Sequence, residues 1–319
     1  MRRAASDVAG PERPAAEPGL TPATQLWVTG LSLLTSLLVL IATTVGIATA
    51  FGHQHRAFLS LWGETILIQG GGLYGHESVS EAAQAIGLDL VSLLIAIPLL
   101  LVATFLAAKG SIRGRLLQAG LLWYFAYTYL IYSFGAAYNR FFLIYVGIFS
   151  ASSFAFVLSV LSINVDSLPV RFSPRFARRT VAWLMIGTWA IVLLLWLDRI
   201  LPSIASDRPP PGLESYTTLP VQAVDLALAI PLGILSGVLL LQRRPVAYLL
   251  AAVVLVKTTT LGLGVVALVI TMAVSGLPVA IPEAAFAAIV TLLGGVAAIH
   301  LFSSLAGGSI EGTSGHPGR

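Results

Sequence analysis

Long apolar segments separated by short polar ones run along almost the whole chain. Each holds about 20 residues or more, and a helix rises about 1.5 Å per residue, so each is long enough to cross a hydrocarbon core about 30 Å thick. The runs are continuous and lack the alternation typical of barrel strands. The pattern therefore predicts an all-α integral membrane protein with eight transmembrane helices, at residues 25–50, 86–108, 116–135, 141–164, 181–200, 219–241, 246–274 and 284–306.

Composition supports this class and excludes several others. Of the 319 residues, 57% are hydrophobic and 10% are charged, whereas a soluble domain carries about 25% charged residues. The chain has no cysteine, which excludes disulfides, thiolate catalysis and cysteine-ligated metals. Its basic residues form no stripe or aromatic-interleaved patch, so the net charge of +4 indicates no nucleic-acid partner.

The chain is predicted to hold one membrane domain between two tails. Residues 1–23 are rich in alanine, proline and charge and are expected to form a disordered cytoplasmic tail. The Gly/Ser-rich residues 307–319 are expected to form a second cytoplasmic tail. Residues 24–306 then make the eight-helix membrane domain, with a long outer loop at 51–84. The first apolar segment is too long for the apolar region of a signal peptide, so we expect it to be retained.

Lysine and arginine positions predict the orientation. With the N-terminus in the cytoplasm, the cytoplasmic segments hold 13 of the 18 Lys and Arg residues and the outer segments hold four. Because basic loops stay on the cytoplasmic side, both termini are predicted to lie there, in the cytoplasmic membrane of a bacterium. The densest basic loop is expected to contact anionic lipid headgroups through Arg171, Arg175, Arg178 and Arg179.

One tetrapeptide occurs twice. Ala-Ile-Pro-Leu stands at Ala96–Leu99 and again at Ala229–Leu232, each time after an Asp-Leu pair near the outer end of a predicted helix. Two four-helix halves of the same orientation would make parallel repeats, an arrangement found in transporters. A chance match in sequence this rich in leucine and alanine is the alternative, and the pattern leaves both open.

The outer loop holds a second group of candidate residues. Ser78 and Glu81 fit a capping box, which predicts a helix start near Val79, and residues 57–69 are expected to form a short interfacial or re-entrant piece. Glu64, His76 and Glu77 are candidate acid/base groups. Metal ligation by the loop histidines is a weaker alternative, since no His-Glu-x-x-His motif supports it, and no metal is predicted.

Ionisable residues inside the apolar segments are the stronger functional candidates, because an isolated charge in a bilayer costs several kcal/mol. Asp89 and Asp225 are expected near the outer interface and Lys257 near mid-membrane. Asp225 is the natural partner of Lys257. A gap of about 9 Å in helix rise favours a bridge by a tyrosine or a water over direct contact. A polar contact that only fixes helix packing is the alternative.

Aromatic residues complete the predicted site. Residues 116–135 carry seven aromatic side chains, among them Tyr124 and Tyr127, and the tight outer turn that follows brings Tyr138 and Asn139 to the same depth as the aspartates. The predicted binding residues are therefore Asp89, Asp225, Lys257, Tyr124, Tyr127, Tyr138 and Asn139. A stacked aromatic core is the alternative. The membrane-interface belt is assigned to Trp27, Trp62, Tyr74, Trp183 and Trp196.

Residues 70–90, 121–139 and 225–250 resemble segments of an uncharacterised group of polytopic membrane proteins from bacteria and archaea. The resemblance implies no activity, so it assigns no role to any residue. The leading hypothesis is a secondary transporter or channel for a small solute or ion. The alternatives are an enzyme or sensor that works through loop 51–84, and a structural subunit of a membrane complex. No phosphate-binding or dinucleotide motif is present, and neither a cofactor nor an enzymatic activity is favoured.

Overall fold

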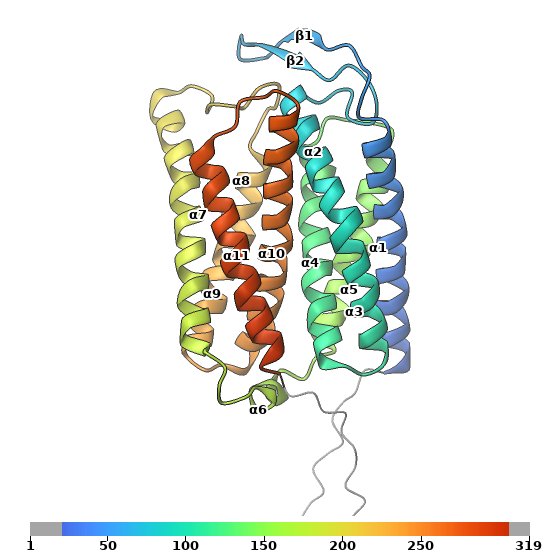
Figure 1. The fold of residues 1–319 in the computed structure, drawn as a ribbon, viewed down its shortest axis with the longest axis vertical. Coiled ribbons are helices and arrows are strands. Elements are labelled where there is room, and N and C mark those ends of the chain that lie inside the picture. The colour runs from blue at the N-terminus through green and yellow to red at the C-terminus, as the bar shows by residue number, and fades with distance from the viewer. Residues whose placement is uncertain (1–20, 306–319) are drawn as a thin grey trace, which may run out of the picture.

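In the computed structural model, which describes residues 21–305, eight long helical rods lie side by side (Figure 1). Six are single helices: α1 (Pro22–Ala48), α4 (Ile112–Gly135), α5 (Phe142–Leu161), α7 (Arg178–Ser206), α10 (Pro245–Val274) and α11 (Ile281–Ser303). Two are composite: α2 (Val79–Val91), η1 (Ser92–Ala96) and α3 (Ile97–Ala108) form one, and α8 (Pro220–Val224), η3 (Asp225–Ala229) and α9 (Ile230–Leu241) form the other. Most of both predicted tails, residues 1–20 and 306–319, lies outside the described residues.

Seven of the rods between residues 21 and 305 are long and apolar enough to cross a membrane, which supports the predicted multi-pass, all-α class. The remaining rod, α4, is 24 residues long. It is less apolar because Arg113, Arg115 and Gln118 lie in its first two turns and four tyrosines follow. Helix α4 packs against α3, α5 and α10, and three of its four tyrosines, Tyr124, Tyr127 and Tyr129, are buried. Composition therefore supports seven of the eight predicted crossings.

The two ends of the bundle differ. One end carries an antiparallel hairpin of β1 (Arg56–Leu59) and β2 (Thr65–Ile68), and we call it the hairpin end (Figure 1). The other end carries the short helices η2 (Val165–Ser167) and α6 (Leu168–Arg171) and both ends of the described chain, and we call it the α6 end. The segment predicted as an interfacial or re-entrant piece at 57–69 is a β-hairpin and does not re-enter the bundle, while its interfacial position stays a prediction. A tight turn at Ser60–Gly63, with Gly63 at a φ of 81°, folds the segment back on itself as strands.

The predicted start of α2 is confirmed. The Ser78 hydroxyl accepts a hydrogen bond from the Glu81 backbone N–H at 3.1 Å, and the helix begins at Val79. This bond satisfies one of the free amides that every helix N-terminus leaves exposed. Six residues of the predicted loop 51–84 therefore belong to the helix, and the connection ends at Ser78.

Both composite rods contain a π-helical turn, and in each a proline lies two positions after the last residue of that turn. η1 is followed by Ile97-Pro98 and η3 by Ile230-Pro231. Proline has no N–H, and its ring clashes with the carbonyl four residues earlier. The backbone accommodates this with the wider hydrogen-bond spacing of a π-turn. The repeated tetrapeptide thus marks the same irregularity in two rods.

The two rods also follow the same backbone course from the π-turn to the turn after it. Each position in the second rod is numbered 133 higher than its counterpart in the first, as with Ser92 and Asp225, the first residues of η1 and η3. The next turn repeats too: Gly110 and Arg243 both adopt positive φ, 82° and 62°. The Ser111 and Arg244 amides donate to carbonyls five residues earlier at 3.0 and 3.1 Å. By the same count, Tyr124 on α4 corresponds to Lys257 on α10.

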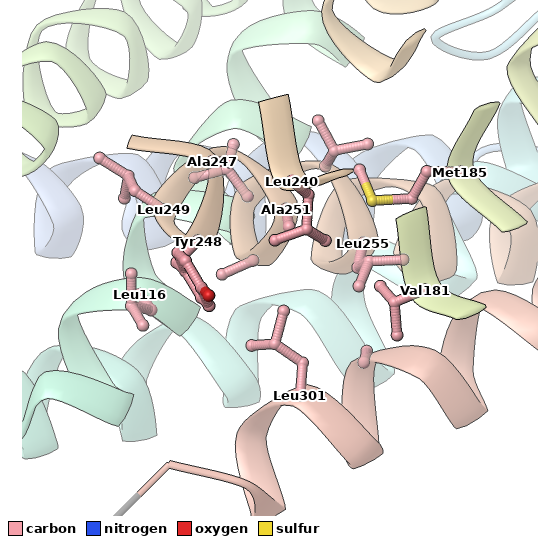
Figure 2. Close-up of a cluster of buried hydrophobic side chains, with 14 of the residues drawn as sticks. Leu116, Val181, Met185, Leu240, Ala247, Tyr248, Leu249, Ala251, Leu255 and Leu301 are labelled. Carbon is pink, nitrogen blue, oxygen red and sulfur yellow. The ribbon is translucent and has the colours of Figure 1, made fainter. Parts of the chain in front are cut away.

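Helix α10 lies in the middle of the largest apolar core, whose side chains Figure 2 shows. Leu249 and Leu255 of α10 meet Leu116 of α4, Met185 of α7 and Leu301 of α11. Leucines on the outside of α1, α7 and α11 are exposed, as expected where lipid replaces water and association depends on close packing. The central position of α10 means that a polar group on its inner face is enclosed by protein.

Candidate functional site

The buried ion pair between Asp225 and Lys257 is the centre of the candidate site. Lys257 Nζ lies 4.0 Å from Asp225 Oδ1, so the predicted partnership is confirmed. The expectation that a gap of about 9 Å in helix rise would prevent direct contact was wrong. That expectation assumed straight α-helices. The π-turn that begins at Asp225 puts more residues into each turn, which brings the carboxylate closer to the depth of Lys257.

Two donors hold the Asp225 carboxylate. Tyr127 Oη donates to Oδ1 at 2.7 Å, and Trp196 Nε1 donates to Oδ2 at 3.0 Å. They come from α4 and α7, so three rods meet at this side chain. Hydrogen bonds to both oxygens fix the orientation of the carboxylate. The tyrosine bridge that the sequence predicted is therefore present, in addition to the direct ion pair.

The Lys257 ammonium is enclosed by aromatic rings. Its side chain is 1% exposed, and Nζ has no hydrogen-bond acceptor among residues 21–305. It lies 3.7 Å from the centre of the Tyr127 ring and 5.1 Å from that of Trp189, both within cation–π range. The Trp189 ring fits against α9 because Gly233 leaves room; a Cβ there would overlap the indole. We call Asp225, Lys257, Tyr127, Trp189 and Trp196 the ion-pair site.

Two members of the ion-pair site were not predicted. Trp189 had no assigned role, and Trp196 was assigned to the interfacial belt, although its indole N–H bonds Asp225. Seven residues apart, they lie on one face of α7. That spacing, together with a buried charge expected on a neighbouring helix, is the signal that could have identified them.

Tyr124 does not join the ion-pair site. Its hydroxyl lies 2.9 Å from Ser92 Oγ, and both side chains are buried. These two residues are the counterparts, by the offset of 133, of Lys257 and Asp225. Equivalent positions in the two composite stretches thus hold a neutral hydrogen-bonded pair and an ion pair.

Asp89 lies in a separate cluster near the hairpin end. Its Oδ2 accepts a 2.6 Å hydrogen bond from the Tyr74 hydroxyl, and no bond between residues 21 and 305 links Asp89 to Asp225 or Lys257. Tyr74, predicted for the interfacial belt, is only 4% exposed. Burial and the adjacent Asp89 carboxylate raise the pKa of Tyr74 well above its ordinary value. The rings that surround this bond are Tyr129, Tyr132 and Tyr145.

Tyr138 and Asn139 lie in the turn between α4 and α5, away from the ion pair. The Tyr138 side chain is 78% exposed and stacks on Phe142. Asn139 Oδ1 accepts from the Phe141 backbone N–H at 2.8 Å, which makes it a turn residue. It also lines a cavity of about 280 Å³ at the hairpin end, together with Gly72, Leu73, His76 and Arg140.

The three outer-loop candidates are not gathered into one cluster. Glu64 is exposed in the hairpin turn and His76 is exposed beside the cavity. Glu77 is buried; its Oε1 accepts from the Ala137 N–H at 2.8 Å and its Oε2 accepts from the Tyr216 hydroxyl. Within residues 21–305 no three His, Asp or Glu side chains are placed to share a metal ion. Glu77 therefore ties three connections together at the hairpin end.

Glu77 should make the hairpin-end connections more stable at acidic pH. Burial raises the pKa of its carboxyl above the ordinary value, against the opposing effect of its bonds to Tyr216 and Ala137 and of His76, while Glu214 adds to the rise. The protonated form is favoured on folding, so its stabilisation is present at low pH and lost as pH rises through the raised pKa. Glu77→Gln mimics the protonated form. We expect the melting temperature of the variant, relative to wild type, to increase from pH 4 to pH 8; a pH-independent difference would contradict this.

The arginine cluster lies at the α6 end. Arg178 Nη1 donates to the carbonyls of Leu240 and Leu241, the latter at 2.8 Å, and so caps the last turn of α9. Arg175 and Arg179 are exposed, as the predicted contact with lipid headgroups requires, and Arg171 ends α6.

Comparison of the chain with protein-family models, curated proteins and solved structures finds no match. The geometry of the ion-pair site is therefore the basis for inferring function.

Proposed function

We propose that this protein is a secondary transporter, or a channel-like protein, for a small solute or ion in the cytoplasmic membrane. The observation that carries the proposal is the Asp225–Lys257 pair, buried among apolar helices at the start of a π-turn. Ionisable groups inside membrane helices are costly and mark ion or substrate pathways, and π-turns occur often at functional sites. A contact needed only for packing would be cheaper without charge.

We further propose that α4 also crosses the bilayer, which makes eight crossings with both termini in the cytoplasm. Its 24 residues correspond to about 36 Å of helix, and its lower hydropathy is compatible with a position inside the bundle. The α6 end carries Arg171, Arg175, Arg178 and Arg179, and basic segments favour the cytoplasmic side. The hairpin end then faces outward.

The proposal also includes two parallel four-helix repeats, made of α1 to α5 and α7 to α11. The offset of 133 residues supports it, because it relates the π-turns, the prolines and the following turns. Contacts between helices are also reciprocal: α4 packs against α8 and α10 packs against α2. Repeats with a binding site between them are a common transporter architecture.

Flux measurements test the proposal. Full-length protein in proteoliposomes should move at least one radiolabelled solute from a panel of amines, amino acids, sugars and inorganic ions, and Asp225→Asn/Lys257→Met should abolish that flux. The double substitution removes both charges, so the variant keeps no unpaired buried ion. Glu64→Gln and His76→Gln are the matched loop controls and should leave flux unchanged. Loss of flux in the loop variants alone would favour the sensor or enzyme hypothesis, and no flux for any solute would contradict transport.

A further inference from the structure

The ion-pair site has two parts that differ in how firmly they are held. Both carboxylate oxygens of Asp225 are bonded, at 2.7 Å by Tyr127 and at 3.0 Å by Trp196. Lys257 Nζ has three N–H groups and no acceptor within hydrogen-bond distance among residues 21–305, and its contact with Asp225 at 4.0 Å is longer than a hydrogen bond. The carboxylate is therefore fixed by the protein, whereas the ammonium is the loosely held partner.

The walls around the ammonium favour a positive charge. Aromatic rings present a negative face, and the rings of Tyr127 and Trp189 lie 3.7 and 5.1 Å from Nζ. If Lys257 swings away, the space keeps one carboxylate and two ring faces. Such a space attracts a cation and repels an anion, so it has the composition of the aromatic cages that bind ammonium groups.

The protein builds this cage in one half only. The residue equivalent to Gly233, which makes room for the Trp189 ring, is Leu100, and the residues equivalent to Asp225 and Lys257 are Ser92 and Tyr124. The neutral pair in the first half shows that a stretch of the same backbone course can hold uncharged side chains at these two positions.

Carboxyl groups gather at the hairpin end, close to the start of α8. Asp225 follows α8 directly, five residues below Pro220, which is about 8 Å along the helix axis. In the connection before α8, burial and the carboxylates of Glu77, Glu81 and Glu214 raise the pKa of Tyr216. The carboxyl groups of Glu77, Glu81 and Glu214 thus lie close to the Tyr216 hydroxyl in the connections at the hairpin end.

From these observations we propose that the ion-pair site is a binding site for a small ammonium-type organic cation, and that Lys257 occupies it as a tethered substitute when no ligand is bound. The inference deepens the proposed function and rests on it. Binding of the cation to Asp225, Tyr127 and Trp189 displaces the Lys257 side chain, so ligand and lysine alternate in one cage.

The first experiment fills an emptied cage. In purified full-length Lys257→Ala, n-propylammonium replaces the atoms removed from the lysine and should raise the melting temperature; 1-propanol, the neutral control, should not. The same amine should have no effect on Asp225→Asn/Lys257→Ala. If n-propylammonium does not stabilise Lys257→Ala, the cage does not bind ammonium and the inference is wrong.

The second experiment asks whether a free ligand displaces Lys257, which a purely structural ion pair would not permit. Binding of methylammonium, tetramethylammonium, choline and guanidinium to the wild-type protein is followed by tryptophan fluorescence. We expect at least one to bind, Asp225→Asn/Lys257→Met to abolish binding, and Trp189→Leu to weaken it about tenfold, which is within the range of one buried cation–π contact.

Three outcomes would overturn the inference. If n-propylammonium stabilises Lys257→Ala but no cation binds the wild-type protein, the Asp225–Lys257 pair has only a structural role. Binding of acetate or another carboxylate that is lost in Lys257→Ala would make Lys257 an anion site. Equal binding by wild type and Asp225→Asn/Lys257→Met would place the cation elsewhere. Because binding is measured without flux, cation binding with no transport would contradict only the proposed function, and transport of an uncharged or anionic solute only this inference.

Discussion

Lys257→Met alone should lower the free energy of unfolding by about 3–5 kcal/mol, because the substitution leaves the buried Asp225 carboxylate without its counter-charge. Methionine has a similar length and suits an apolar interior, so the change removes charge with little change in packing. Asp225 is buried beside Tyr127 and Trp196, and two neutral donors do not replace a full positive charge. Unfolding by sodium dodecyl sulfate in mixed micelles measures the loss.

The double variant Asp225→Asn/Lys257→Met should recover most of that stability, since no unpaired charge remains. Tyr124→Phe, at the position equivalent to Lys257, is the matched control. It breaks one hydrogen bond to Ser92 and should cost about 1 kcal/mol. If Lys257→Met and Tyr124→Phe lower the free energy of unfolding by the same amount, the Lys257 ammonium stabilises the protein no more than one neutral hydrogen bond, and the ion pair is not a stability determinant.

Gly87→Ala should destabilise the protein by about 1–3 kcal/mol, the usual cost of overpacking. Gly87 lies on α2 where it crosses α10, and a Cβ at this position would overlap the backbone of Ala267 and Leu268. Backbone atoms of a long helix cannot move aside as a flexible side chain can, so the two helices must separate. The hydrogen bond from the Thr271 hydroxyl to the Ala83 carbonyl, 2.7 Å long, would weaken as well.

Gly30→Ala is the control, and we expect it to change stability in the opposite direction from Gly87→Ala. Gly30 is an exposed residue inside α1 with no atom near its missing Cβ. Alanine is a better helix former than glycine, so this substitution should stabilise by up to about 1 kcal/mol. Melting temperatures of both variants in the same detergent compare them. Equal shifts would show that the close approach of α2 and α10 does not limit stability.

Several local features could be predicted because they depend on neighbours in the chain. The lengths of the apolar segments identified the rods to within seven residues at each end, and Ser78 marked the start of α2. The pairing of Asp225 with Lys257 followed from the cost of leaving either charge alone in an apolar bundle. The repeated Ala-Ile-Pro-Leu marked two π-turns, although the sequence pattern did not predict their geometry.

Other features depended on contacts between distant segments. The hairpin at 56–68 was missed because a short apolar segment has no decisive period. Tyr74 and Trp196 have the composition of interfacial residues, but a buried carboxylate offers each a hydrogen bond, which decides their position. The placement of Tyr138 outside the site follows from the turn that Asn139 closes.

By itself the sequence determined a bundle of apolar helices, the position of a repeated Ala-Ile-Pro-Leu in two of them and the need for Lys257 to find a counter-charge, because each follows from local composition and the low polarity of lipid. Only the tertiary structure decided which aromatic rings surround that lysine, and that its equivalent in the other half is a neutral tyrosine. The physical reason is that ring contacts and hydrogen bonds between α4, α7, α9 and α10 depend on how the helices are rotated and shifted against one another. Small residues such as Gly87 and Gly233 set that packing through the space they leave, and no local pattern reports it.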